Sequence, residues 1–153
     1  MLVQHIVTVT TPRQPLVVGN VCNSVPASGR VLIKLQGMVG SAPAVVLIDC
    51  GATGNFVSKS FASANGVKLE ASPDTVKMAN GQIQNADGVA SARLSIGSYR
   101  DSLDLTATTL EGYDVILGMP WLAQYNPKVD WREHSLSFVG PDKEQHVLRR
   151  ALT

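Results

Sequence analysis

The sequence predicts a mainly β fold with two short helices, and three observations support this prediction. Short apolar or alternating runs are separated by Gly, Pro and Asn, a pattern typical of strands joined by turns. Asn80-Gly81 lies between two such runs and is a strong hairpin signal. Only two segments carry helix start and stop signals, so the strand–helix alternation of a parallel sheet is missing. The length of 153 residues and the hydrophobic content of 44% fit one globular domain.

Composition and charge argue against several classes of function. The net charge is +1 and no stripe of Lys and Arg is visible, so nucleic acid is not an expected partner. The apolar start of the chain is interrupted by Gln4 and His5 and is too short for a signal peptide or a membrane span. Cys22 and Cys50 are too few for a disulfide framework, and the three histidines lack ligand spacing. We therefore expect an intracellular, cytoplasmic protein without a metal or other cofactor and without a membrane partner.

The first elements follow a turn-rich arm that covers residues 1–28. Within the arm, residues 7–10 alternate and could form an edge strand. We expect a strand at 31–35, a connecting loop at 37–43, and a strand at 44–48. The last of these is a continuous apolar run, as expected for a strand that is covered on both faces.

A short helix and a hairpin come next. Ser58 is a suitable N-cap for a helix over residues 58–65, and Gly66 is a suitable stop. The segments 76–79 and 82–84 flank Asn80-Gly81 and should pair as the two arms of a hairpin.

The rest of the domain repeats the strand pattern around a second helix. Pro120 suits the first turn of a helix that covers residues 121–125. Trp121 and Trp131 are expected to be packing residues. The expected strands are 89–96 and 103–107, which alternate, the apolar run 113–117, and a final hairpin of 129–131 and 135–139. The chain thus divides into an arm (1–28), a domain (29–140) and a polar C-terminal tail (141–153).

Asp49 is the residue with the clearest chemical signal. It stands at the end of the buried strand 44–48 and is followed by Cys50 and Gly51. A carboxylate without a partner near a core costs several kcal/mol, so Asp is rare there unless it has a partner or a task. Taken alone, Asp-x-Gly also fits a carboxylate that caps a turn. The motif occurs once in the chain.

Three features in order resemble the retropepsins, the dimeric aspartic proteases of retroviruses and long-terminal-repeat retrotransposons. They are the strand and loop of residues 45–53, the Asn80-Gly81 hairpin, and Val115-Ile116-Leu117-Gly118. The resemblance is closest to the Ty3/gypsy class and covers about residues 30 to 139. It implies a closed β-barrel protomer that acts as a homodimer on an extended peptide. The motifs that resemble the Ty3/gypsy class in particular are Asp49-x-Gly51-Ala52-Thr53-x-Asn55-Phe56-Val57-Ser58, Tyr113-Asp114-Val115-Ile116-Leu117-Gly118-Met119-Pro120-Trp121-Leu122, and Asn126-Pro127-x-Val129-Asp130-Trp131.

The resemblance also implies roles for individual residues. Asp49 and its symmetry mate would share one proton and activate a water molecule. Gly51 would permit the tight turn of the active-site loop, and Ala52 would keep its wall small. Cys50 and Thr53 complete this loop.

The hairpin around Asn80-Gly81 would be the flap that closes over the substrate, although an ordinary surface hairpin has the same signature. The strand before the second helix would pass behind the active-site loop, with its terminal glycine in close backbone contact. The expected flap and substrate-binding residues are Met78, Ala79, Asn80, Gly81 and Ile83, and the expected supporting residues are Ile116, Leu117 and Gly118.

Cys50 departs from the family pattern, which has Ser or Thr at this position. The hydroxyl would bond to the partner chain, and a thiol is a weak donor and acceptor, so the dimer should be weaker. A disulfide between the two Cys50 residues across the dimer axis is a second possibility. The first-choice function is an aspartic endopeptidase that cleaves a retroelement polyprotein. The alternatives are a catalytically weak or inactive dimerisation or binding module of the same fold, and a domesticated protease with another substrate.

Overall fold

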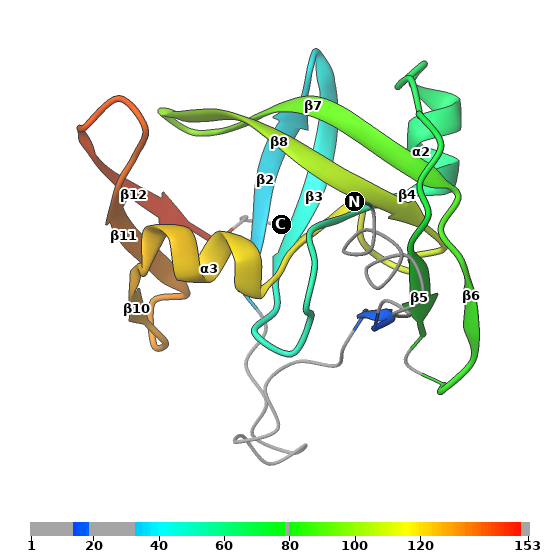
Figure 1. Cartoon of the computed structure of the whole chain (residues 1–153). Helices are drawn as coiled ribbons and strands as arrows, with labels where there is room; N and C mark the ends of the chain where they lie inside the picture. The colour runs from blue at the N-terminus through cyan, green and yellow to red at the C-terminus, as the bar shows by residue number, and fades with distance from the viewer. Residues whose placement is uncertain (1–13, 19–32, 79, 151–153) are drawn as a thin grey trace, which may run out of the picture.

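The computed structural model describes residues 14–18, 33–78 and 80–150, and a closed six-stranded barrel is its centre (Figure 1). The strands follow the order β2-β3-β9-β4-β8-β7 around the barrel. Their bounds are β2 (Ile33–Val39), β3 (Ala42–Ile48), β4 (Phe56–Ser58), β7 (Gly88–Ile96), β8 (Tyr99–Thr108) and β9 (Val115–Leu117). The prediction of a mainly β closed barrel is confirmed, and two short helices form within the described residues.

The hairpin of β2 and β3 replaces the loop that was predicted at 37–43. Strand β2 continues to Val39 because alternate side chains along it are buried, and β3 begins at Ala42. Gly40 makes the turn with a φ of 60°, which suits glycine. The prediction of a loop over residues 37–43 was wrong. It placed Pro43 in the loop, whereas Pro43 lies within β3 and pairs with Met38 of β2. The predicted strand 44–48 is confirmed as part of β3.

Both predicted helices form. In α2 (Lys59–Ala64) the Ser58 hydroxyl accepts the Phe61 N–H at 3.3 Å, as expected for an N-cap, and Gly66 follows with a φ of 67°. Helix α3 (Met119–Tyr125) has Pro120 in its first turn and buries Trp121.

The long hairpin of β7 and β8 supplies much of the barrel core. Its nine paired positions run from Gly88↔Ala107 to Ile96↔Tyr99. Every second residue of β7 is buried, which confirms the predicted alternation over 89–96. Strand β8 is longer than the predicted 103–107 and begins at Tyr99, which is fully buried.

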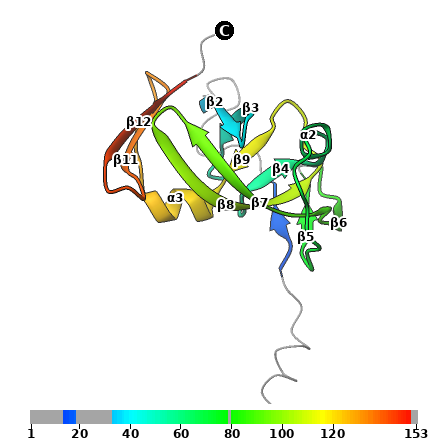
Figure 2. The same cartoon turned by 90° about the horizontal axis from the view of Figure 1, so that it is seen from above.

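A second sheet, of order β10-β11-β12, lies at one end of the barrel beside α3 (Figures 1 and 2). Strands β10 (Lys128–Asp130) and β11 (Ser135–Val139) form the predicted final hairpin. The predicted polar tail instead contains β12 (Gln145–Arg149), which pairs with β11. Alternate burial explains the difference, since His146 and Leu148 are buried while Gln145, Val147 and Arg149 are exposed. Trp131 is 51% exposed, so its prediction as a packing residue was wrong, whereas Trp121 is fully buried.

The third sheet, of order β1-β5-β6, lies at the opposite end of the barrel (Figures 1 and 2). Strands β5 (Thr75–Lys77) and β6 (Ile83–Asn85) are the arms of the predicted hairpin, and Gly81 at its tip has a φ of 90°. Strand β1 (Leu16–Val17) belongs to the arm and runs parallel to β5. The predictions for 7–10, for Cys22 and for the start of strand 31–35 fall outside the described residues. No helix in the described ranges is long and apolar enough to cross a membrane.

Candidate active site

Asp49 lies directly after β3, where the chain leaves the barrel. Its N–H donates to the Leu117 carbonyl at 3.0 Å, which continues the parallel pairing of β3 and β9 by one residue. Asp49 is 1% exposed, and its own carbonyl accepts the Ala52 N–H at 3.2 Å. The backbone on both sides therefore holds the carboxyl group in a fixed, buried position.

The two oxygens of the Asp49 carboxyl group differ in their surroundings. Oδ1 accepts the Gly51 N–H at 2.8 Å. Oδ2 is buried and has no hydrogen-bond partner among the residues that the structure describes. Burial raises the pKa of the carboxyl group from 3.8 to about 6, and the Gly51 N–H opposes this rise. A carboxyl group with this pKa can hold or release a proton near neutral pH, as a general acid or base must.

Gly118 lies against the active-site loop, as the sequence analysis expected. A Cβ atom on Gly118 would overlap the Gly54 carbonyl oxygen and lie 2.6 Å from the Ala52 carbonyl oxygen. The Gly118 N–H donates to Asn55 Oδ1 at 3.0 Å, and the Met119 N–H donates to the Ala52 carbonyl at 2.8 Å. Only glycine therefore fits at the point where the strand passes behind the loop.

Ile116 and Leu117 precede that glycine in β9 and lie in the barrel wall. Strand β9 pairs with β3 on one side and with β4 on the other. Ile116 packs in a hydrophobic cluster with Ala52 and Phe56, and Leu117 packs in the main core. These positions support the loop from behind, next to the strand that carries Asp49.

Thr53 contacts the arm, which nothing in the sequence indicated. Its hydroxyl oxygen accepts the Val17 N–H at 2.7 Å, and its N–H donates to the Val17 carbonyl at 2.9 Å. A side-chain and a main-chain group of the loop thus hold both main-chain groups of one arm residue.

Cys50 is half-buried and does not carry a free thiol in the structure, because its sulfur is disulfide-bonded. The expectation of a free thiol at Cys50 was therefore wrong. The other cysteine of the chain, Cys22, lies outside the described residues.

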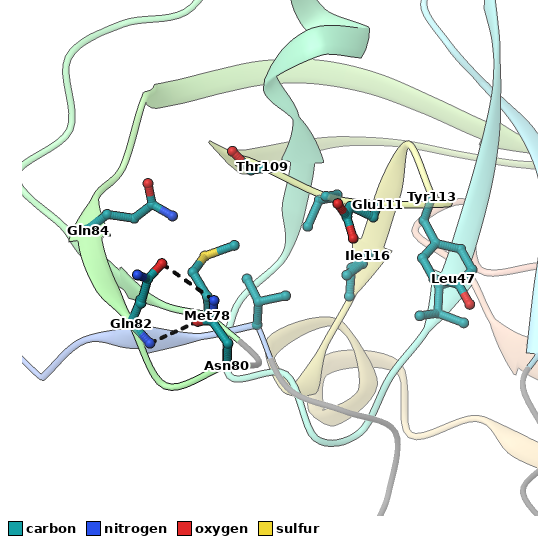
Figure 3. Close-up of a pocket in the computed structure, with 11 residues that line it drawn as sticks. Leu47, Met78, Asn80, Gln82, Gln84, Thr109, Glu111, Tyr113 and Ile116 are labelled. Atoms are coloured by element: carbon teal, nitrogen blue, oxygen red, sulfur yellow. Dashed lines mark hydrogen bonds between the residues drawn. The ribbon is translucent and has the colours of Figure 1, made fainter.

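A cleft of about 500 Å³ lies between the hairpin and the barrel (Figure 3). Met78 and Asn80 line it from the hairpin, and Leu47 and Ile116 line it from the barrel. Of the other expected flap residues, Gly81 is at the tip, Ile83 is 58% exposed and outside the cleft lining, and Ala79 is not described. Alternation in β6 explains the position of Ile83, because its neighbours Gln82 and Gln84 point toward the cleft instead.

Two polar residues support the site although the sequence analysis gave them no role. Asp114 Oδ2 accepts the Val45 N–H at 2.8 Å and so ties the entry of β9 to β3. Asn55 bonds to Gly118 as described above. Both residues belong to the motifs quoted above. The sequence signal that could have identified them is a polar residue directly before a short apolar strand, as Asn55 stands before Phe56-Val57 and Asp114 before Val115-Ile116-Leu117. No group of three or more potential metal ligands occurs among the described side chains.

Comparisons with known proteins agree with this geometry. The sequence model of the PEG10/RTL1 protease domain matches residues 45–147 of the chain. The crystal structure of the retroviral protease-like domain of Ddi1 from Leishmania major is similar, with a TM-score of 0.60 at 12% sequence identity. That similarity covers 80% of this chain and 96% of the Ddi1 domain, and at this identity it shows the fold. The matched residues include Asp49, the hairpin and Gly118, and the chain belongs to the PEG10/RTL1 family of retropepsin-like protease domains.

Proposed function

We propose that the protein is an aspartic endopeptidase whose active site forms when two copies of the chain pair. The observation that carries the proposal is the buried Asp49 carboxyl group, whose Oδ2 lacks a partner among the described residues. Such an oxygen costs free energy, and proteins keep one where the group has a task. The chain contains one Asp-x-Gly-Ala motif, so the second carboxyl group of a dyad must come from a second chain.

The chemistry follows from placing two such groups together. Two carboxyl groups about 3 Å apart cannot both ionise, so the pair holds one proton at pH values where single groups would be charged. The ionised Asp49 takes a proton from a water molecule, whose oxygen attacks the carbonyl carbon of the peptide. The protonated Asp49 of the other chain gives its proton to the carbonyl oxygen. Collapse of this intermediate breaks the C–N bond. The amine leaves with the proton that the first Asp49 took from water, and a hydroxyl of the intermediate gives its proton to the other Asp49, which restores the singly protonated pair.

Asp49 is already adapted to both roles in the single chain. Its pKa of about 6 lies between that of an exposed carboxyl group and neutral pH. A group with a pKa near the working pH exchanges protons most effectively with a reacting molecule.

The proposed substrate is an extended segment of a retroelement polyprotein. It would lie between the hairpin and the active-site loop and add as a strand to the edge of β5 that faces away from β6. Met78 and Asn80, which line the cleft, would contact its side chains, and Gly81 would let the hairpin tip close over it. Membership in the PEG10/RTL1 family supports descent of the domain from a retroelement, and because this family is domesticated it also favours the domesticated protease given below as a further candidate.

Cleavage of a peptide library by the wild-type chain between about pH 4 and 7 tests the proposal, since carboxyl dyads titrate in this range. Asp49→Asn should lower the rate by a factor on the order of 10² to 10⁴, the usual contribution of a general acid or base. Asp104→Asn is the matched control, because Asp104 is exposed on β8, and its rate should equal that of the wild type. Equal rates for Asp49→Asn and the wild type would refute the proposed chemistry.

The second candidate is a dimerisation or binding module of the same fold, and Cys50 in place of Ser or Thr favours it. Such a module would bind peptide and show no cleavage that depends on Asp49. A domesticated protease with another substrate is the third candidate. Its cleavage of peptides would still depend on Asp49, but the peptides that it prefers in the library would not resemble cleavage sites of a retroelement polyprotein.

A further inference from the structure

We propose that residues Leu16–Val18 of the arm act as a tethered inhibitor. They occupy the peptide-binding strip of the protease, which we define as the edge of β5 that faces away from β6 together with the main-chain and hydroxyl groups of Thr53. The proposal rests on the proposed function, because it concerns the site at which a peptide substrate would bind. Its basis is the set of main-chain contacts that this short segment makes within the structure.

The segment uses both of its edges. On one edge it pairs in parallel with β5, with Leu16 opposite Val76 and Val17 opposite Lys77, and the Val18 N–H donates to the Lys77 carbonyl at 3.0 Å. On the other edge both main-chain groups of Val17 bond to Thr53 at 2.7 and 2.9 Å. Successive residues of a strand present their main-chain groups to opposite sides, and these contacts follow that rule. The segment therefore lies as a strand between the hairpin and the active-site loop.

The side chains of the segment also fill the site. Val18 is 8% exposed and packs in the cluster that contains Ala52 and Val76, and Leu16 packs against the same cluster. Val18 also lines the cleft of Figure 3. An aliphatic side chain of the arm thus occupies an apolar position between the hairpin and the barrel.

The position of the segment makes it a competitor of substrate. Strand β5 pairs with β6 on its other side, so its edge toward β1 is the one that an added strand must use. Thr53 is four residues after Asp49, and its N–H already donates to Val17. A peptide that used these groups would have to displace the arm. Asp49 itself is 1% exposed, so access to its carboxyl group also requires movement of neighbouring chain.

Because the segment belongs to the same chain as the site, its binding is intramolecular and can compete even if the segment binds weakly. A peptide that is covalently joined to its site has an effective concentration in the millimolar range. If its intrinsic dissociation constant is about 0.1 mM, substrate must overcome about tenfold inhibition. The effect should appear in KM and leave kcat unchanged, because the arm competes for binding and takes no part in the chemistry.

The main test compares four chains, the wild type and three variants, and measures peptide cleavage against substrate concentration. Val17→Pro removes the N–H that donates to Thr53, and Val18→Asp places a charge in the apolar cluster. Each should lower KM about tenfold relative to the wild type, with kcat unchanged. Gln14→Pro is the matched control, because Gln14 is exposed and precedes β1, and its KM should equal that of the wild type. Circular dichroism checks that each variant keeps its fold.

The outcomes separate this proposal from the proposed function. An unchanged KM in both folded variants, with cleavage still dependent on Asp49, would overturn the tethered inhibitor alone. Mass spectrometry should find the wild-type arm intact during the assay. A cut after Val18 that depends on Asp49 would make the segment a substrate and overturn its role as a standing inhibitor.

A binding measurement covers the case in which no chain cleaves peptide. The synthetic peptide Gln-Pro-Leu-Val-Val-Gly, which is the sequence of residues 14–19, is titrated into a chain that carries both Asp49→Asn and Val17→Pro. Saturable binding at millimolar concentration or below would support the occupied strip, and its absence would refute it. The same titration into Asp49→Asn alone should require a higher peptide concentration by about tenfold, because the native arm is still bound.

Discussion

Asp49 follows β3 and Asp101 lies in β8, and the partners of these two carboxylates differ. Asp49 is buried and has one hydrogen bond, from Gly51 to Oδ1. Asp101 is half-buried and accepts hydrogen bonds from the Tyr99 and Tyr125 hydroxyls at Oδ2 and from the Ser102 N–H at Oδ1. Every oxygen is satisfied at Asp101, whereas Asp49 Oδ2 has no partner among the described residues. The hydrogen bonds of Asp101 stabilise the fold, whereas Oδ2 of Asp49 remains available to bind a proton.

The surroundings of Asp101 form an aromatic cluster that joins the barrel to α3 and the β10–β12 sheet. Tyr99 makes edge contacts with Trp121, Tyr125 and Phe138 at centroid distances between 5.2 and 5.9 Å. The Trp121 Nε1–H donates to the Tyr99 hydroxyl at 2.8 Å. Burial and the adjacent Asp101 raise the pKa of Tyr125 to about 12, so this hydroxyl remains a donor. Stability should therefore depend on this cluster more than on the active-site loop.

The largest expected effect on stability is that of Trp121→Ala. Trp121 is fully buried in the cluster, so its removal leaves a large cavity and the Tyr99 hydroxyl without a donor. We expect a loss of about 3–5 kcal/mol in the free energy of unfolding. Urea denaturation followed by circular dichroism measures it. A loss below about 1 kcal/mol in the free energy of unfolding would show that this cluster contributes little to the stability of the fold.

The second effect is a pH dependence of stability that comes from Asp49. Its pKa is about 6 when folded and about 3.8 when unfolded, so the folded chain binds a proton more tightly. This contribution is fully present below about pH 4 and is lost as the pH rises through 6. The total is on the order of 2–3 kcal/mol. Asp49→Asn lacks this contribution, so relative to the wild type it should gain stability between pH 4 and 7.

Urea denaturation of the wild type and Asp49→Asn at several pH values measures this difference. Asp104→Asn, on the exposed face of β8, serves as the control for loss of a carboxylate. If the free energy of unfolding changed with pH in the same way for the wild type and Asp49→Asn, the pKa of Asp49 would not be raised in the folded chain. Asp49 would then not differ from Asp101 in the way described above.

Much of the fold and of the site could be predicted because local patterns agree with the tertiary structure. The apolar run before Asp49, the Ser58 cap and the hairpin at Gly81 are each set by neighbouring residues. The close approach of Gly118 to the loop could be expected only from the resemblance of its motif. Local rules thus located the carboxyl group and the strand behind it.

The remaining features depend on contacts between distant segments. Strand β1 has two residues, and its place is determined by β5 and Thr53 rather than by its own periodicity. Strand β12 alternates over five residues among charged neighbours, so it resembled a solvated tail until β11 provided a partner. Strands β1 and β12 both lie at sheet edges, where pairing and not composition decides whether a strand forms. Strand β4 (Phe56–Ser58) was also not predicted, and its place is determined by its barrel neighbours β8 and β9.

Tyr99→Phe should have a smaller effect than Trp121→Ala. The substitution keeps the ring and removes the hydroxyl that accepts from Trp121 Nε1 and donates to Asp101. The buried indole N–H then lacks an acceptor, which costs about 1–3 kcal/mol. Urea denaturation measures the loss, and Tyr125→Phe is the comparison because Tyr125 lies nearer the surface. A loss in Tyr125→Phe that exceeds that of Tyr99→Phe would place the critical hydrogen bond at the rim of the cluster instead.

Trp131→Ala should have the smallest effect, although it also removes a tryptophan. Trp131 follows β10 and is 51% exposed, whereas Trp121 is fully buried at the centre of the cluster. An exposed side chain loses little packing when it is truncated, so we expect a change within about 0.5 kcal/mol in the free energy of unfolding. Peptide cleavage should also be unchanged, because the β10–β12 sheet lies at the end of the barrel opposite the hairpin (Figures 1 and 2). A loss comparable to that of Trp121→Ala would mean that another copy of the chain covers the outer face of this sheet in solution. The urea midpoint of unfolding would then rise with protein concentration, and that dependence would be the next measurement.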